Sequence, residues 1–275
     1  MQCGAGCAVR AEHYEAMNRR LTIRLSRQSL SFSTVEGGEV VYEPYALKAG
    51  MSAAANMREA LRTATMAAER FERVTVLLDA RVLMVPMNMY SEEDAQLLFS
   101  HTFTVVEHRV VVSHVLPELN AVAVFDVERD LRQVLEERYG QVRLVPVCAP
   151  VWHHLYRRSF TGMKQKLYGY FHDQRMEVFA FQQGRFRFQN QYQVREQGDV
   201  MYFLLSVWKQ LGMDAREDEL HLSGDVPERE ALTEELKRYV KRVLVGNPTG
   251  EFNRAQVTLI EGVPYDLMVY YLKGL

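Results

Sequence analysis

The sequence contains only three cysteines in 275 residues, and two of them, Cys3 and Cys7, lie near its beginning. A low and odd cysteine count argues against the disulfide framework of a secreted protein and favours a reducing compartment. The sequence has no uninterrupted run of about 18 apolar residues, so we expect no transmembrane helix. Its opening residues also lack the apolar core of a signal peptide. A cytoplasmic location is therefore expected.

Neither sign of charge is in excess. The 33 basic and 35 acidic residues give a net charge of -2, which provides no electrostatic reason to expect a nucleic-acid partner. Arg185 and Arg187 alternate with Phe186 and Phe188, a pattern that could stack single-stranded nucleic acid. The same alternation is typical of a strand with one buried aromatic face. With a near-neutral charge, we favour the strand.

Common catalytic and metal-binding motifs are also missing. The sequence contains no G-x-S-x-G elbow, no P-loop and no G-x-G-x-x-G after a strand. Cys3 and Cys7 alone cannot complete a tetrahedral metal site. His153 and His154 adjoin Trp152 near Cys148, but adjacent helical side chains point about 100° apart. We therefore expect these histidines to have a structural role at a domain junction, and we expect no metal site.

The first half of the chain contains a clear strand pattern. Apolar and polar residues alternate at 21–25 and 30–34, and a third strand is expected at 40–45. Turn residues separate these segments at 26–29 and 36–38. Ser52 is a candidate N-cap for a helix that reaches about residue 71, and a buried strand follows at 73–79. The expected unit is β-β-β-α-β.

The second half repeats this order. Strands are expected at 166–171, 176–181 and 185–192, with turns at 172–175 and 182–184. Gly198 and Asp199 open a helix that Gly212 closes, and a fourth strand follows at 219–224. An ordered repeat of five elements indicates two related α/β domains with mixed sheets, facing each other across a cleft. The alternative is two unrelated α/β domains that share a common unit.

Additional elements lie between the two repeats. Four strands are expected at 81–85, 108–115, 121–126 and 142–147, together with a helix capped by Ser91 that ends near residue 100. An amphipathic helix at 127–140 places Val127, Leu131, Val134 and Leu135 on one face. We expect a flexible leader at 1–16, a first domain at 17–160 that includes these additions, and a second domain at 161–275 with a C-terminal helix.

The pattern, together with the phrases LTIRLS, SFS and LHLSG and the helix after Pro264, resembles the actin-like ATPase (ribonuclease H-like) fold. From about Met17 the chain more closely resembles an uncharacterised bacterial family, a domain of unknown function with that fold. It is also distantly similar to the actin-like platform proteins of type IV pili and type II secretion. The resemblance covers most of the length.

The resemblance implies a nucleotide site at two hairpin tips, where active members bind phosphate and magnesium with aspartates and glycines. In the first tip, Arg24 stands at the position of the aspartate and Ser26 at that of a glycine. In the second tip, Gly169 or Tyr170 stands where the other aspartate is expected. Asp173 could substitute for it, although aspartate is also a favoured turn residue. Metal-dependent ATP hydrolysis is therefore not expected.

The segment LHLSGD resembles the adenosine-contacting turn of these proteins. Ser223 and Gly224 are in place, and Asp225 stands where a second glycine is usual. Asp225 could instead cap a helix that starts near Pro227. Binding of ATP without hydrolysis stays open, and Arg24 could contact phosphate directly.

These residues lead to two functional expectations. The first is a non-catalytic binding or assembly module with a degenerate nucleotide site, whose partner is a protein, such as a peptide or a membrane-protein tail. No nucleic-acid partner and no membrane insertion are expected. The alternative is a nucleotide-binding protein or ATPase-like enzyme with an unconventional interdomain site. Its candidate residues are Arg24, Ser26, Asp173, Ser223, Gly224 and Asp225.

Overall fold

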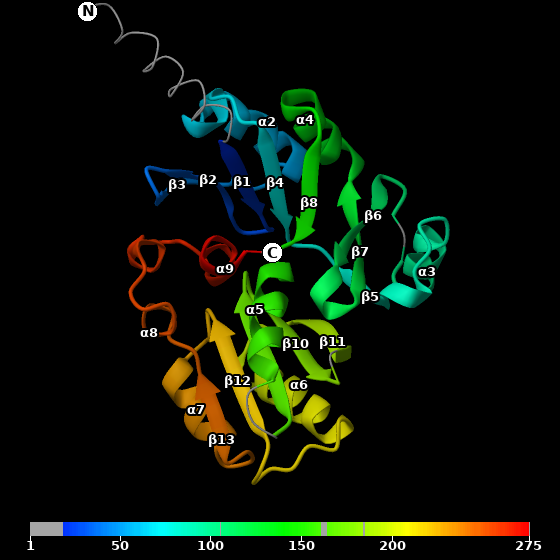
Figure 1. Ribbon diagram of the computed structural model, residues 1–275, viewed down its shortest axis with the longest axis vertical. Helices are drawn as coiled ribbons and strands as arrows, with labels where there is room; N and C mark the ends of the chain where they lie inside the picture. The colour runs from blue at the N-terminus through cyan, green and yellow to red at the C-terminus, as the bar shows by residue number, and fades with distance from the viewer. Residues whose placement is uncertain (1–18, 105, 161–163, 184, 275) are drawn as a thin grey trace, which may run out of the picture. The chain divides into compact units, whose positions relative to one another are not determined.

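The computed structural model describes residues 19–104, 106–160, 164–183 and 185–274 (Figure 1). The predicted leader, with Cys3, Cys7 and Met17, lies outside these ranges. The chain divides into two compact units. The first comprises residues up to 83 with 91–114 and 124–147, and the second comprises 84–90, 115–123 and the residues from 148 onward. The predicted domain ranges stay predictions, because this division does not test which segments fold independently.

The first unit contains a five-stranded mixed sheet with the order β3-β2-β1-β4-β8. Strands β1, β2 and β3 form an antiparallel meander, whereas β4 and β8 continue from β1 in parallel. A meander followed by parallel strands requires a crossover connection, which helix α2 supplies between β3 and β4. The strands are Arg20–Leu25 (β1), Leu30–Glu36 (β2), Glu39–Tyr45 (β3), Arg73–Leu78 (β4) and Val142–Pro146 (β8).

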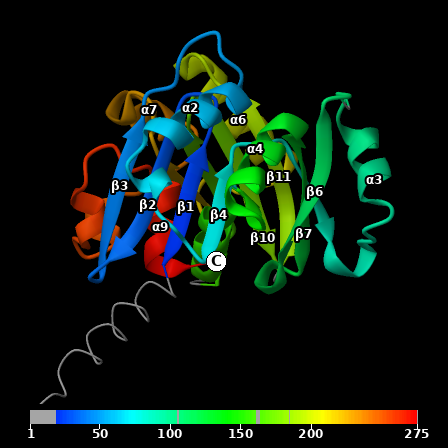
Figure 2. The same cartoon turned by 90° about the horizontal axis from the view of Figure 1, so that it is seen from above.

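The crossover helix α2 (Ala53–Thr63) begins as predicted, because the Ser52 hydroxyl accepts a hydrogen bond from Ala55 N. It ends well before residue 71. The Glu43 carboxylate accepts hydrogen bonds from the backbone N–H groups of Thr65 and Met66, both at 2.7 Å. These bonds start a separate 3₁₀ turn after the helix. Helix α4 (Arg129–Tyr139) packs beside α2, as Figure 2 shows.

Strands β5 (Val82–Pro86), β6 (Arg109–Leu116) and β7 (Ala121–Glu128) form a three-stranded sheet in the order β5-β7-β6. Helix α3 (Ala95–Thr102) begins four positions after Ser91, so the predicted cap is wrong. A hydrogen bond from Ala95 N to Glu92 O belongs to the turn that precedes the helix. Val127 is buried, as expected of the amphipathic pattern, but it lies on β7 and not on α4.

The second unit contains a sheet of the same design, with the order β11-β10-β9-β12-β13. Its first three strands are again antiparallel, and β12 and β13 are again parallel to β9. The repeat of four strands predicted in each half is therefore confirmed, whereas the fifth strand of this sheet, β13, was not predicted. The strands are Lys166–His172 (β9), Arg175–Gln182 (β10), Arg185–Gln193 (β11), Glu219–Gly224 (β12) and Arg242–Val245 (β13).

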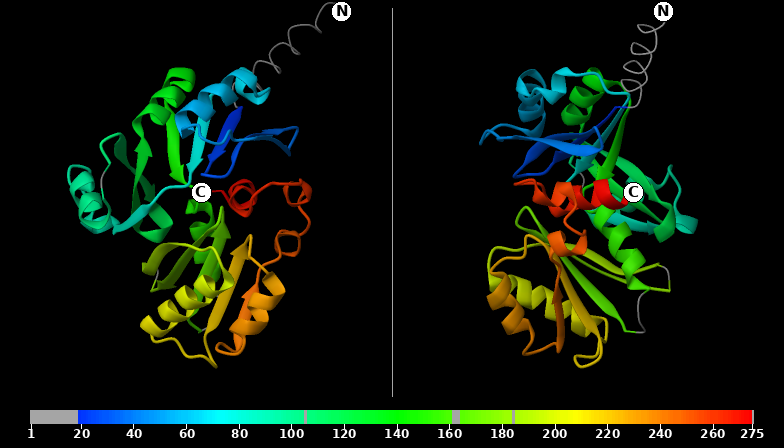
Figure 3. Two further views of the ribbon diagram at one scale, coloured as in Figure 1. Left: turned by 180° about the vertical axis from the view of Figure 1, so that it is seen from behind. Right: turned by 60° about the vertical axis from the view of Figure 1, so that its left-hand side comes forward.

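Helices cover both faces of this second sheet. Helix α5 (Ala149–Ser159) lies in front of the sheet in Figure 1 and contacts α9 (Tyr265–Lys273). Helices α6 (Gln197–Gln210) and α7 (Arg229–Leu236) contact each other, and α6 lies on the opposite face, as the rear view in Figure 3 shows. The short helix α8 is Pro248–Glu251. Among the helices of the described residues, none has both the length and the apolar character needed to cross a bilayer.

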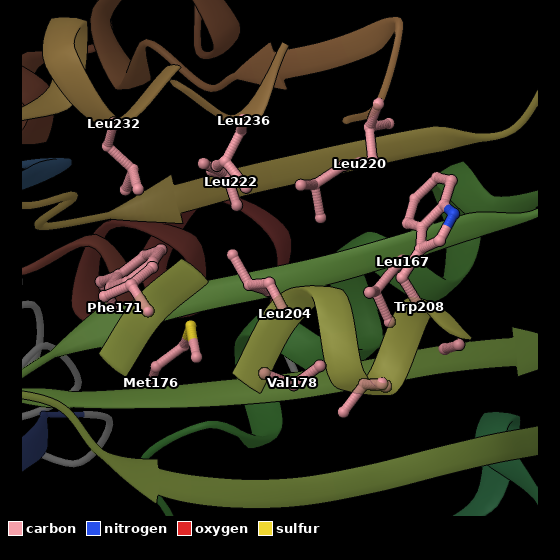
Figure 4. Packing of buried hydrophobic residues seen from close by; sticks show 14 of the residues in the cluster. Leu167, Phe171, Met176, Val178, Leu204, Trp208, Leu220, Leu222, Leu232 and Leu236 are labelled. Atoms are coloured by element: carbon pink, nitrogen blue, oxygen red, sulfur yellow. The ribbon is translucent and has the colours of Figure 1, made fainter. Parts of the chain in front are cut away.

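Side chains alternate between these two faces along each strand. On the face toward α6, Leu167, Leu204, Trp208, Leu220 and Leu222 belong to one buried apolar cluster (Figure 4). The alternate residues of β9 point to the other face, toward α5 and α9. They include Tyr170, whose hydroxyl donates a hydrogen bond to Asp266 of α9.

Candidate functional site

The first hairpin tip, between β1 and β2, is held by its own side chains. Arg24 is 2% exposed, and its Nη1 donates a hydrogen bond to Ser29 Oγ at 2.6 Å. Ser26 Oγ accepts hydrogen bonds from Gln28 N at 3.1 Å and from Ser29 N at 2.9 Å. The Ser26 side chain therefore stabilises this turn by hydrogen bonds, at a position where the resemblance implies a glycine.

These residues do not fit a magnesium–phosphate site of the kind that the resemblance implies. Magnesium binds oxygen ligands, usually carboxylates and water, whereas the side chain at position 24 is a guanidinium that is always charged and has no acceptor. A buried cation at this position would repel a metal ion. We therefore derive no metal-dependent step at this hairpin.

The second hairpin tip joins β9 and β10 through Asp173 and Gln174. Their φ angles are +45° and +58°, and His172 pairs directly with Arg175 across the turn. Two central residues with positive φ define a type I′ turn, which favours asparagine, aspartate and glycine. The turn geometry therefore accounts for Asp173, whose carboxylate Oδ2 also lies 3.3 Å from His172 Nδ1.

The end of β12 packs closely on β9. Gly224 has a φ of +80°, and a Cβ atom at this position would lie 2.1 Å from Phe171 O. The neighbouring Asp225 N donates a hydrogen bond to the same carbonyl oxygen at 3.0 Å. The glycine is thus required by contact between two strands. Asp225 does not cap α7, which begins at Arg229 after Glu228, so that predicted alternative is wrong.

Ser223 lies beside a cavity of about 230 Å³ within the second unit. Its hydroxyl is buried and has no hydrogen-bond partner among the described residues. The remaining polar groups that line the cavity come from strand β12 and from helices α5, α8 and α9. They are Arg158, His221, Glu251 and Tyr265. Ser223 therefore lines a cavity whose other polar side chains are mostly charged, and its own hydroxyl is desolvated without a partner.

Glu251 connects several of these groups. Its carboxylate contacts His154 Nε2 at 2.8 Å and Tyr265 Oη at 3.1 Å, and it also pairs with Arg158. Burial alone would raise the pKa of Glu251, but the hydrogen bond from His154 and the charge of Arg158 lower it below the usual range. Burial and the neighbouring Glu251 raise the pKa of Tyr265. Glu251 is therefore a carboxylate that stays ionised although it is buried.

The two adjacent histidines of α5 have different partners. His153 Nε2 lies 2.7 Å from Glu118 Oε2, whereas His154 contacts Glu251. The two rings therefore do not share a ligand, as expected from their angular separation on a helix. Both contacts tie α5 to neighbouring segments of its own unit.

Each unit brings its own predicted residues together. Arg24 and Ser26 share the first tip, while Ser223, Gly224 and Asp225 follow one another at the end of β12. The sequence reasoning missed a further group, in which ligand atoms of Cys148, His172 and Glu177 lie within 4.8 Å of one another. The spacing of these residues along the sequence matches no metal-binding motif considered above. Only the register of β9 and β10 could have shown that His172 and Glu177 lie on the same face.

The two repeated sheets define a protein of the actin-like ATPase fold. A structure from Bacteroides thetaiotaomicron, described as a protein with actin-like ATPase fold and unknown function, matches with a TM-score of 0.80 and 26% identity. The match covers 90% of this chain and 98% of that chain. The fold expected from the sequence is therefore confirmed.

A model for a family of proteins of unknown function, DUF3822, matches residues 10–243, and the chain belongs to this family. A chain of the PilM–PilN type IV pilus biogenesis complex matches with a TM-score of 0.59 and 14% identity, over 93% of this chain and 98% of that one. At this identity the similarity concerns the fold. A search among curated proteins found no match.

Proposed function

We propose that this protein is a non-catalytic binding or assembly module with a degenerate nucleotide site. The observation that supports the proposal most directly is Arg24, a buried guanidinium bound to Ser29 at the position where the resemblance implies a metal-binding aspartate. The second tip supports it as well, because its two-residue loop contains no glycine with which to approach a phosphate.

The partner class that we propose is a protein segment, such as a peptide or the tail of a membrane protein. PilM occurs in a complex with PilN, which supports this choice by analogy of fold alone. A cytoplasmic location stays a prediction from the low cysteine count.

Thermal unfolding in the presence of ATP tests the first half of this proposal. A ligand that binds only the folded state at about 100 times its Kd stabilises that state by about 2.7 kcal/mol. We expect no shift with ATP and magnesium, and no release of phosphate above the rate of a buffer control. A shift with magnesium and measurable hydrolysis would contradict the proposal.

Binding of synthetic peptides tests the partner class. Suitable peptides represent the cytoplasmic tails of membrane proteins encoded beside the gene of this protein, and their binding can be followed by fluorescence anisotropy. We expect at least one saturable interaction that a scrambled peptide does not reproduce. Because this assay contains no nucleotide, its result is independent of the ATP experiment.

A second candidate function is binding of a nucleotide or another small polar ligand without hydrolysis. It is favoured by the unpartnered hydroxyl of Ser223, which lies beside the cavity that Arg158 and Glu251 also line. Thermal unfolding with ATP in EDTA distinguishes this candidate. A shift that survives EDTA and is lost in Ser223→Ala would support it, and the absence of any shift would exclude ATP as the ligand.

A further inference from the structure

The buried group of Cys148, His172 and Glu177 combines three chemically different metal ligands. Cys148 immediately precedes α5, His172 ends β9, and Glu177 lies on β10. His172 pairs with Arg175 across the hairpin, which puts Glu177 two residues further along on the same face. The start of α5 brings the thiol to that face. The three side chains thus converge from three elements of one unit.

The distances suit a tetrahedral ion. Cys148 Sγ lies 3.5 Å from His172 Nε2, and Glu177 Oε1 lies 4.0 Å from the same nitrogen. Zinc bonds of about 2.3 Å to sulfur and about 2.0 Å to nitrogen or oxygen give a sulfur–nitrogen edge of roughly 3.5 Å and a nitrogen–oxygen edge of roughly 3.3 Å in a tetrahedral site. The sulfur–nitrogen edge already has this length, whereas Glu177 Oε1 would have to move closer to His172 Nε2 by about 0.7 Å.

Neighbouring groups orient two of these ligands as the second shell of a metal site does. The Asp173 carboxylate lies 3.3 Å from His172 Nδ1, so a proton on Nδ1 leaves the Nε2 lone pair directed toward Cys148 and Glu177. Gln189 Nε2 donates to Glu177 Oε2 at 3.2 Å, which leaves Oε1 directed toward His172. Histidine ligands that donate their other nitrogen to a carboxylate are the usual arrangement at zinc.

The charge of the group also favours a cation. Cys148, His172 and Glu177 are 3%, 2% and 2% exposed. Among the described residues, no lysine or arginine lies within ion-pair distance of Glu177, and its titratable neighbour is His172, whose Nε2 lies 4.0 Å from Glu177 Oε1. A buried carboxylate is costly unless a positive charge compensates it. We propose that Cys148, His172 and Glu177 bind a divalent transition-metal ion, with zinc as the best match to a thiolate, imidazole and carboxylate set.

A cysteine nucleophile is the rival interpretation. Cys148 contacts one ring nitrogen of His172 and Asp173 contacts the other, which is the arrangement of a thiol, a base and an acid that orients the base. Two observations favour the metal. The side chains are almost completely buried, which is unsuitable for attack on a substrate. In addition, Glu177 lies near His172 Nε2, the same nitrogen that the thiol contacts. A catalytic triad needs one carboxylate, on the other ring nitrogen, and none at this position.

Metal analysis of the full-length purified protein tests the proposal. Cys3→Ser/Cys7→Ser serves as the parent, so that these two cysteines cannot contribute thiolates. After incubation with zinc and gel filtration, plasma mass spectrometry should detect about one zinc per chain. Cys148→Ser and Glu177→Gln should each weaken zinc binding at least about tenfold, and Asp173→Ala should weaken it by about 10- to 100-fold.

His221→Asn is the matched control. This histidine belongs to the same unit and contacts Glu219 at 2.9 Å, outside the proposed site, so its substitution should leave zinc binding unchanged. Replacement of zinc by cobalt gives a second readout, since a thiolate-to-cobalt charge-transfer band should appear in the parent and be absent in Cys148→Ser. Circular dichroism identifies any variant that fails to fold.

Three results would overturn the proposal. The first is a parent protein that retains well under one equivalent of zinc or cobalt after incubation. The second is a folded Cys148→Ser/Glu177→Gln protein that binds zinc as tightly as the parent. The third is rapid alkylation of Cys148 by iodoacetamide at a rate that zinc does not change, which would favour the reactive cysteine instead.

Discussion

The hydroxyl of Tyr170 donates a hydrogen bond to Asp266 Oδ2 at 2.6 Å, and both residues are at most 1% exposed. The bond joins β9 to α9 inside the second unit. Tyr170→Phe removes one donor from a buried carboxylate and should lower the free energy of unfolding by about 1–3 kcal/mol. Tyr202→Phe is the control, because Tyr202 is 67% exposed and should change stability by less than about 0.5 kcal/mol. Urea denaturation measures both, and equal values would refute the assignment.

Gly224 tests the close approach of β12 to β9. Alanine at this position would need a left-handed backbone and would place its Cβ 2.1 Å from Phe171 O. We expect Gly224→Ala to destabilise the protein by roughly 2–4 kcal/mol. Gly198→Ala is the matched control, since a Cβ in the first turn of α6 meets no atom within 4 Å. It should be neutral or stabilising by up to about 1 kcal/mol. Similar melting temperatures for the two variants would contradict the contact.

The sequence predicted two serine helix caps, of which the structure confirms one. Ser52 Oγ accepts from Ala55 N at 3.2 Å, whereas α3 begins at Ala95, away from Ser91. Ser52→Ala should therefore cost about 1 kcal/mol, and Ser91→Ala should change stability by no more than about 0.5 kcal/mol. Chemical denaturation of both variants gives the comparison, and a larger loss for Ser91→Ala would reverse the assignment.

The repeated sheets could be predicted because their signals are local. Alternating side chains define the strands of both hairpins, and Gly37 and Gly38, with positive φ, mark a turn that permits one register. The start of α3 was wrong because Ser91 is as favourable in a turn as at a cap. The end of α2 depends on Glu43, a strand residue whose carboxylate binds the segment after the helix.

The candidate sites were harder to predict because the contacts that form them join residues far apart in the sequence. Gly224 matched a nucleotide-binding pattern, but its positive φ follows from contact with Phe171 of another strand. Cys148 and His172 are 24 positions apart and come together only because α5 packs on the sheet. Tertiary packing decides such contacts, and a single sequence carries no local signal for them.

His114 should make the stability depend on pH. Burial, helped by the nearby charge of Arg143, lowers the pKa of His114 to about 4 from the ordinary 6.5. The unfolded chain therefore binds a proton below pH 6.5 that the folded chain takes up only near pH 4. Stability is fully present above pH 6.5 and falls as the pH decreases through this window, by about 3 kcal/mol in total.

The test compares the unfolding free energies of three proteins at pH 7 and at pH 4.5. His114→Gln removes the titrating group and should reduce the loss between these two values, relative to the parent. His108→Asn replaces an exposed histidine and should leave the loss unchanged. If all three proteins lose the same amount, another group causes the dependence.

Ser223 and Ser33 provide a comparison of two buried hydroxyls. Ser33 Oγ donates to Thr22 O at 3.3 Å, whereas Ser223 Oγ has no partner among the described residues. Ser33→Ala should lower the unfolding free energy by about 1 kcal/mol. Ser223→Ala removes a hydroxyl that is desolvated without compensation, so it should be neutral or stabilising. Thermal unfolding in ligand-free buffer measures both, and a clear loss in Ser223→Ala would mean that a bound molecule or ordered water satisfies this hydroxyl in the cavity.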